Sequence, residues 1–236
     1  NLSLAETSRN FQDDMENGTN DWTHNGINDL WHLTTHRFSS SNHSWYVGNE
    51  GDWEYDNSQH CWLVSPEFHV EEAATLTFQH WIDAELYNEN EAWDGGIVEI
   101  SLNDYDWTQL TPEGGYPYQI YDNPASPFPA GTPCFAGVNS GWNLASFELT
   151  SFAGETVQLR FRFGSDSYVT EEGWYIDDVS VTGVSLDWLA VEPISGVVPP
   201  ASDAFVTVCF DAAGYEDVTL TGQINLLSND PPWYRK

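Results

Sequence analysis

The chain has 236 residues, of which 37 are acidic and 6 are basic, so its formal net charge is −31. This charge excludes nucleic acid and anionic membranes as partners, because binding to either depends on Lys and Arg. Aromatic residues make up 15% of the chain and supply a core, while no apolar run approaches the roughly 20 residues of a membrane span. We therefore expect a folded protein that is secreted or exposed at the cell surface, where salt or calcium offsets the repulsion between the acids.

The start of the chain divides into a short segment and an acidic turn. Residues 1–10 form an N-terminal segment in which Leu2 and Leu4 alternate with other residues. The turn that follows reads Asp13-Asp14-Met15-Glu16-Asn17-Gly18. Because Ca²⁺ takes carboxylate and carbonyl oxygens, this turn is a candidate for one half of a calcium site.

Alternation of apolar and polar residues dominates the chain beyond the turn. The pattern is clear at residues 75–82, 145–149, 156–163, 206–210 and 218–226. Such alternation predicts half-buried strands of antiparallel sheets, and no segment shows the helical period of about 3.6 residues. The sequence therefore predicts an all-β protein.

Residues 103–141 interrupt this pattern and hold six of the 12 prolines. A loop of this length in a compact domain is usually functional or disordered. Several aromatic residues lie in it, namely Tyr116, Tyr118, Tyr121, Phe128 and Phe135. We expect these rings to pack the segment into an ordered flap.

The strand at residues 173–181 changes the parity of its apolar residues. One pair shares one parity and a second pair shares the other: Trp174 with Ile176, and Val179 with Val181. A bulge at Asp177-Asp178 would keep all four inward, and burial of the strand on both faces is the alternative. A bulge also redirects side chains, which suits a cation site shared with the acidic turn.

A domain boundary is expected near Gly183-Val184, where a second and smaller set of strands begins. The residues beyond it are few for a sandwich of about 7 strands, so we expect a partial β domain without its closing strand. The expected organisation is an N-terminal segment at 1–10, a large β domain at 11–183 and a small one at 184–236.

A series of motifs follows in a recognisable order: Asp14-Met15-Glu16-Asn17-Gly18 with Trp22, Ser65-Pro66-Glu67-Phe68, Asp94-Gly95-Gly96-Ile97-Val98-Glu99-Ile100-Ser101, Gly141-Trp142, Phe152-Ala153-Gly154, Arg160-Phe161-Arg162-Phe163, and Glu172-Gly173-Trp174-Tyr175-Ile176-Asp177-Asp178-Val179. With these motifs, residues 11–182 resemble the MAM-like jelly-roll modules of secreted immune-inhibitor-A-type metallopeptidases and the cleaved-adhesin modules of gingipain-like proteins. Residues 186–230, with Trp188-Leu189, Pro193-Ile194-Ser195-Gly196 and Leu227-Ser228-Asn229-Asp230-Pro231, resemble the Ig-like repeats that follow such modules. The resemblance implies a jelly-roll β-sandwich followed by a smaller, incomplete Ig-like β-sandwich.

The resemblance also implies a metal. In such families the acidic turn and the Ile-Asp-Asp-Val strand bind a structural Ca²⁺ ion. Carried over residue by residue, this implicates Asp14, Glu16 and Asp178, with Asp177 as a further candidate. The alternative is that these carboxylates simply face solvent in a chain that is rich in acids.

No catalytic motif stands out. The chain has neither the His-Glu-x-x-His of a zinc peptidase nor a Gly-x-Ser-x-Gly nucleophile elbow, and acids are too abundant to single out a pair. We therefore expect no enzymatic activity in this chain itself.

Ligand binding is the more plausible role, because Trp and Tyr rings stack well while keeping a polar group. The loop candidates are Trp53, Tyr55, Tyr87, Trp93, Tyr116, Tyr118 and Tyr121. Arg160 and Arg162 project from one face of one strand and are candidates to clamp an anionic ligand. The alternatives are that the rings fold back onto the sheet and that the two arginines pair with neighbouring carboxylates.

The chain has three cysteines, a small and odd number that argues against a disulfide scaffold. A bond between Cys61 and Cys134 stays open, since an extracellular protein permits one. Cys209 alternates with strand residues and is expected to be a small buried hydrophobe.

The leading hypothesis is a non-catalytic, calcium-stabilised accessory module of a secreted bacterial multidomain protein, which binds a glycan or an extracellular protein. A second hypothesis is a subunit of an extracellular filament or surface layer that self-assembles by strand exchange through an open sheet edge. A third is a fragment of a secreted metallopeptidase whose catalytic domain lies elsewhere.

Overall fold

The computed structural model describes residues 2–6, 9–184, 189–192, 195–196, 205–210 and 224–228. These residues belong to two compact units, a large one formed by Asn10–Gly183 and a small one formed by Asn1–Arg9 with Val184–Lys236. Among the described residues the sole helix is a single 3₁₀ turn, Thr150–Phe152. The all-β class predicted from the alternating pattern is therefore confirmed, and no described helix is long and apolar enough to cross a membrane.

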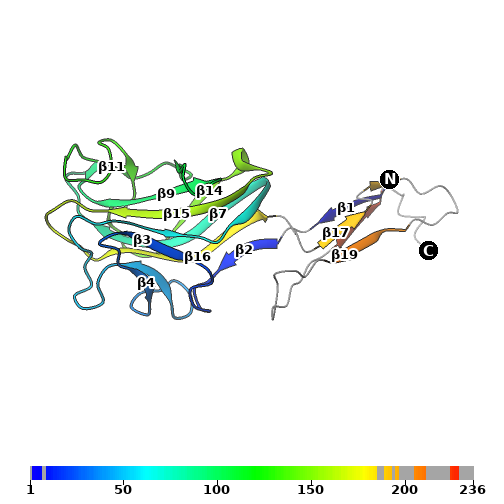
Figure 1. Cartoon of the computed structure of the whole chain (residues 1–236), viewed down its shortest axis with the longest axis horizontal. Coiled ribbons are helices and arrows are strands. Elements are labelled where there is room, and N and C mark those ends of the chain that lie inside the picture. Colours follow the sequence, from blue (N-terminus) through cyan, green and yellow to red (C-terminus); the bar gives the residue numbers. More distant parts are fainter. Residues whose placement is uncertain are drawn as a thin grey trace. The chain divides into compact units, whose positions relative to one another are not determined.

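The large unit is built from strands β2 to β16. Their bounds are β2 Arg9–Asp13, β3 Thr23–Ile27, β4 Trp31–Thr34, β5 Ser44–Val47, β6 His60–Val64, β7 Phe68–Ala84, β8 Glu91–Ala92, β9 Gly95–Ser101, β10 Thr108–Gln109, β11 Tyr118–Ile120, β12 Pro133–Cys134, β13 Gly137–Val138, β14 Asn143–Glu148, β15 Thr156–Gly164 and β16 Gly173–Val184. Twelve of them form one curled sheet with the main order β10-β9-β15-β7-β16-β5-β4. Figure 1 shows β7, β9, β15 and β16 as long strands that run side by side.

Strand β7 joins the two layers of the sandwich. It has 17 residues, pairs with β15 near its start and pairs with β14 over six positions further on. Its predicted alternating run at 75–82 therefore lies inside a longer strand, and the runs at 145–149 and 156–163 coincide with β14 and β15. The predicted strands of the large unit are confirmed.

The core lies between the layers and is rich in aromatic rings. Phe78 from β7 meets Phe161 from β15 edge to face, with ring centroids 4.9 Å apart. Phe161 in turn lies 5.9 Å from Trp174 of β16. Each of these three side chains is fully buried, so residues that are far apart in the sequence form one packed centre.

The parity change in β16 coincides with a left-handed residue at the position of the predicted bulge. Asp178 has a φ of +51°, a left-handed conformation inside a strand, and Val179 and Val181 remain buried beyond it. Tyr175 and Asp177 are buried as well, so the first half of the strand is covered on both faces. The left-handed residue and the two-sided burial thus occur together, although they were expected as alternatives.

The segment at 103–141 is an ordered flap, as predicted. It contributes β10 to β13, and Ile120, Phe128 and Phe135 are all buried. Phe135 exchanges backbone hydrogen bonds with Gly96 of β9, each 2.9 Å long. The buried rings of Phe128 and Phe135 hold the flap against the sandwich, because they pack against apolar residues.

The cysteines are free, and one prediction about them is wrong. Cys61 and Cys134 are each buried without a disulfide bond. Cys209 was expected to be buried, but it is exposed. It lies on β19 (Thr207–Phe210), which pairs with β17 (Leu189–Glu192) in a two-stranded sheet, and the preceding residues Thr207 and Val208 are exposed as well.

The small unit uses the N-terminal segment as a strand. β1 (Leu2–Glu6) lies between β18 (Ser195–Gly196) and β20 (Ile224–Ser228) and is antiparallel to both. One edge of β20 is thus paired with β1 in this chain. Self-assembly through a sheet edge stays a prediction, and Trp188 and the strand residues expected at 218–223 lie outside the described residues.

Candidate binding site

The acidic turn after β2 is shaped by Asp13, a residue that the sequence did not single out. Its buried carboxylate accepts hydrogen bonds from the Met15 N–H at 2.8 Å and from the Trp22 indole N–H at 2.9 Å. The Asn20 amide donates to the same carboxylate at 3.2 Å. Met15 adopts a φ of +61°, which the turn requires and Asp13 supports.

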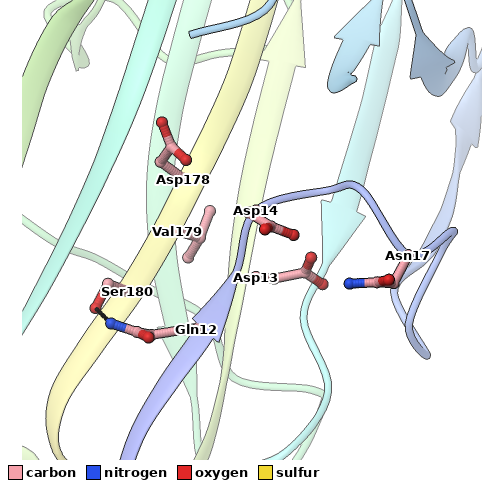
Figure 2. A pocket seen from close by; sticks show the side chains of 7 residues that line it. All are labelled: Gln12, Asp13, Asp14, Asn17, Asp178, Val179 and Ser180. Atoms are coloured by element: carbon pink, nitrogen blue, oxygen red, sulfur yellow. Dashed lines mark hydrogen bonds between the residues drawn. The ribbon is translucent and has the colours of Figure 1, made fainter. Parts of the chain in front are cut away.

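The acidic turn and β16 lie side by side, as the sequence predicted. β2 pairs with β16, and a pocket of about 540 Å³ lies beside them. Its lining is mainly polar, with Gln12, Asp13, Asp14, Asn17, Asp178, Val179 and Ser180 (Figure 2). Two of the four predicted calcium ligands, Asp14 and Asp178, are therefore brought to one pocket.

The other two predicted ligands already have hydrogen-bond donors. Glu16 accepts the N–H groups of Asn42 and His43, both at 2.8 Å, and the Asn42 bond lowers its pKa. Asp177 accepts the N–H groups of Ser39 and Ser40 at 2.7 and 3.2 Å. Burial raises the pKa of Asp177 to about 6, against the effect of these bonds.

A calcium ion needs oxygens with free lone pairs, whereas the Glu16 and Asp177 carboxylates accept N–H groups. Of the four predicted ligands, Glu16 and Asp177 each have one oxygen that is already occupied by two N–H groups, whereas Asp14 and Asp178 line the pocket. Calcium binding by them stays a prediction.

A different trio of acids lies close together. Among the described residues, Glu85, Asp94 and Asp166 each place a carboxylate oxygen within 4.8 Å of the other two, so these side chains could share a cation. Tyr55 donates its hydroxyl to Asp94 at 2.7 Å, and Asn123 donates its amide to Asp166 at 2.7 Å. Burial raises the pKa of Asp94 to about 8 and that of Glu85 to about 7.

Three aromatic rings form a surface cluster next to this trio, which we call the aromatic surface: Tyr87, Trp93 and Tyr121. The ring of Tyr121 lies 3.9 Å from that of Tyr87 and 4.8 Å from that of Trp93, centroid to centroid. Tyr87 is 45% exposed, and Trp93 and Tyr121 are half-buried. The cluster therefore offers ring faces to solvent while its members support one another.

Backbone pairing holds the aromatic surface together from two segments. The turn that carries Tyr87 is closed by its N–H bond to the Glu91 carbonyl at 2.9 Å. β8 pairs with β11 in parallel, and the Tyr121 N–H donates to the Ala92 carbonyl at 2.8 Å. Trp93 directly precedes Asp94, so one hairpin carries Tyr87 and Trp93 of the aromatic surface and also Glu85 and Asp94 of the acidic trio.

The remaining predicted aromatic residues are engaged elsewhere. Tyr55 is 1% exposed, which removes it as a binding surface and corrects the expectation. The Tyr116 hydroxyl accepts the Val98 N–H at 3.1 Å, and Tyr118 is half-buried on β11. Trp53 is half-buried and stacks on His36, with ring centroids 3.7 Å apart.

Arg160 and Arg162 contact one carboxylate between them. Arg160 donates to Glu99 from Nε at 2.7 Å, and Arg162 Nη1 lies 3.6 Å from the same carboxylate. Arg160 also covers the ring of Trp107 at 4.3 Å, and Arg162 covers that of Phe128 at 4.6 Å. The alternative interpretation of these arginines, pairing with a carboxylate, is the one that the structure shows.

The acidic trio is the site that sequence reasoning missed. Asp94 appeared only as part of a family motif, and neither Glu85 nor Asp166 stood out among 37 acids. Spacing could not reveal the trio, because Asp166 lies 72 residues from Asp94 in the sequence.

No family model matches the chain. A segment of Bacillopeptidase F from Bacillus subtilis is 24% identical over 196 residues, which is 81% of this chain and 12% of that protein. A segment of the pre-pro-metalloprotease PrtV from Vibrio cholerae is 30% identical over 107 residues, which is 45% of this chain and 10% of that protein. The chain thus spans about a tenth of the length of these curated relatives.

Solved structures give matches of lower identity. A cleaved-adhesin domain of Lys-gingipain from Porphyromonas gingivalis has a TM-score of 0.47 and 16% identity, covering 75% of this chain and 99% of that one. The module TmCBM61, solved with beta-1,4-galactotriose, has a TM-score of 0.47, 9% identity and the same coverage. Membership of the cleaved-adhesin or MAM-like families stays a prediction.

Proposed function

We propose that this chain is a non-catalytic, extracellular binding module of a larger secreted protein and that it binds a glycan on the aromatic surface. The observation that carries the proposal is the packing of Tyr87, Trp93 and Tyr121 from two segments, with Tyr87 45% exposed. Aromatic faces of this kind stack on the apolar faces of sugar rings, while their hydroxyl and indole groups bind sugar oxygens.

The charge around the aromatic surface narrows the class of sugar that it can bind. Glu89 and Asp122 are exposed beside it, and the Glu91 carboxylate accepts a hydrogen bond from the Asn88 amide at 2.8 Å. These acids repel sulfated or uronic sugars, so the proposed ligand is a neutral or amino sugar chain. The exposed amides Asn88 and Asn90 supply further polar contacts.

The likeness to segments of two proteases supports a place inside a larger secreted protein. Peptidase activity of that parent protein is itself a proposal, because the chain spans only about a tenth of each relative. The proposal for the aromatic surface does not depend on calcium or on the parent's chemistry.

The test is a titration of the chain with neutral and amino oligosaccharides by calorimetry, followed by Tyr87→Ala and Tyr121→Ala. Each substitution should weaken binding at least about tenfold, as loss of a central aromatic contact does. Tyr105→Ala is the matched control, since Tyr105 is 86% exposed and lies outside the aromatic surface. Equal affinity of all three variants, or the absence of binding to every sugar, would overturn the proposal.

A further inference from the structure

The loop between β4 and β5 is tied to acidic side chains along its whole length. At its start, Arg37 donates from Nε and Nη2 to the two carboxylate oxygens of Glu172, and the Nη2 bond is 2.7 Å long. Glu172 also accepts the Tyr175 hydroxyl at 3.0 Å. We call residues 37–43 the clamped loop.

Two neighbouring acids of β16 hold the middle of the clamped loop. Asp177 accepts the Ser39 N–H at 2.7 Å and the Ser40 N–H at 3.2 Å, and Asp178 accepts the Ser40 hydroxyl at 2.6 Å. Adjacent residues of a regular strand point to opposite faces. Here both reach the same loop because Asp178 is left-handed, with a φ of +51°.

The acidic turn holds the end of the clamped loop. One oxygen of Glu16 accepts the N–H groups of Asn42 and His43, each at 2.8 Å. Its other oxygen lies 3.1 Å from the His43 ring nitrogen Nδ1. The Glu16 carboxylate is therefore directed at the loop and not at the pocket beside Asp14, whose lining does not include Glu16.

We infer that Glu16, Asp177 and Asp178 form a metal-free clamp, which binds the N–H and hydroxyl groups of residues 39–43 where the family resemblance implies a calcium ion. A carboxylate oxygen that accepts two N–H groups has both lone pairs occupied. Glu16 and Asp177 each have one such oxygen. The acidic turn and the closing strand thus meet through the protein's own loop.

Aromatic rings pack against residues at the start of the clamped loop. Arg37 lies 4.0 Å above the ring of Trp81, and the neighbouring His36 stacks on Trp53 at 3.7 Å. Trp81 belongs to a small buried cluster with Tyr46 and Tyr175, against which Trp53 and Trp142 pack. Release of the clamped loop would uncover this cluster.

The direct test is amide hydrogen exchange of Ser39, Ser40, Asn42 and His43, measured by NMR with Ca²⁺ alone and with EDTA alone. The clamp predicts that all four amides are protected equally in both conditions. This local readout is needed because the acidic trio offers calcium another place, so a change in melting temperature alone would not distinguish the two.

Two matched variants separate the clamp from a metal site. Glu16→Ala should speed exchange at Asn42 and His43 by about tenfold to about a hundredfold, the range expected for lost bonds to a charged acceptor. Asp14→Ala is the control: it lies in the same turn and is a predicted calcium ligand, but it makes no bond to the loop. It should leave both amides protected.

Three results would overturn the inference. They are protection of these amides in Ca²⁺ but not in EDTA, equal loss of protection in both variants, and unchanged protection in Glu16→Ala. Glu16→Gln guards against a folding defect in the alanine variant, because it keeps an oxygen acceptor and should retain part of the protection. None of these outcomes bears on sugar binding by the aromatic surface.

Discussion

The indole N–H of Trp174 donates a hydrogen bond to Nδ1 of His80 at 3.3 Å in the core of the large unit. His80 is 4% exposed, and its ring lies 4.5 Å from that of Phe135. An imidazole that accepts a hydrogen bond in an apolar site is held neutral, and burial lowers the pKa of His80 to about 4 from an ordinary value of 6.5.

This burial gives the fold a defined sensitivity to acid. The unfolded chain binds a proton at His80 below pH 6.5 while the folded chain does not, so stability is present above that pH and is lost as pH falls toward 4. The loss from this group approaches about 3 kcal/mol. Urea unfolding at several pH values should show a flatter acid slope for His80→Gln than for the parent chain. His69→Gln, at an exposed position, should keep the parent slope, and an equal slope in all three would contradict the argument.

Gly96 is expected to tolerate no side chain. A Cβ atom there would overlap the six-membered ring of Trp174, which the core holds in place. Gly96→Ala should lower the free energy of unfolding by about 1 to 3 kcal/mol, as overpacking does. Gly141→Ala is the control, because a Cβ atom at that position meets nothing within 4 Å. Equal denaturation midpoints for the two variants would show that the core rearranges to accept the added methyl group, and would contradict the expectation.

The carboxylate of Glu99 is expected to be essential for stability. Its side chain is 7% exposed and lies between two arginines whose side chains are 12% and 18% exposed. Glu99→Gln leaves both guanidinium groups buried without a counter-charge, which costs about 3 kcal/mol or more. Glu67→Gln, at an exposed position, should change little. Guanidinium is unsuitable as denaturant because it screens charge, so urea unfolding is the measurement, and a similar midpoint for both variants would refute the expectation.

The pairing of β1 with β20 can be trapped by a disulfide. Ser3 faces Leu227 in the register, and paired strands bring Cα atoms within the range that a disulfide spans. The double variant Ser3→Cys with Leu227→Cys, in a Cys209→Ser background, should form a bond within one chain on oxidation. Failure to form it would contradict the register.

The same variants test the strand-exchange hypothesis. Strand exchange predicts that a mixture of the two single variants forms a disulfide-linked dimer with one copy of each, in excess of the dimers that either variant forms alone. Monomers alone after oxidation of the mixture would remove strand exchange as a route to assembly.

The strands could be predicted because their sequence carries the period of a half-buried sheet. The alternation at 156–163 becomes β15 with Val157, Leu159, Phe161 and Phe163 all buried. The full length of β7 could not be predicted, since it depends on pairing with β15 at one end and β14 along the rest. Partners distant in the sequence determine where such a strand ends.

The candidate sites were harder to predict, for a physical reason. Composition nominated Tyr55 and Tyr121 alike, but only tertiary packing buries the first and leaves the second at the surface. The meeting of the acidic turn with β16 was foreseen from two motifs. The direction of the Glu16 carboxylate was not, because it depends on where the chain at Asn42 and His43 passes.

The register of β1 has a mechanical consequence. Leu2 lies opposite Ser228, so the first residue of β1 and the last residue of β20 are at the same end of the pair. A pulling force applied at this shared end, through Leu2 and Ser228, breaks the hydrogen bonds between the two strands one after another and not all at once. The β1–β20 pair is therefore expected to separate at lower force when it is pulled from Leu2 and Ser228 than when it is pulled from Leu2 and Ile224, which lie at opposite ends of the pair.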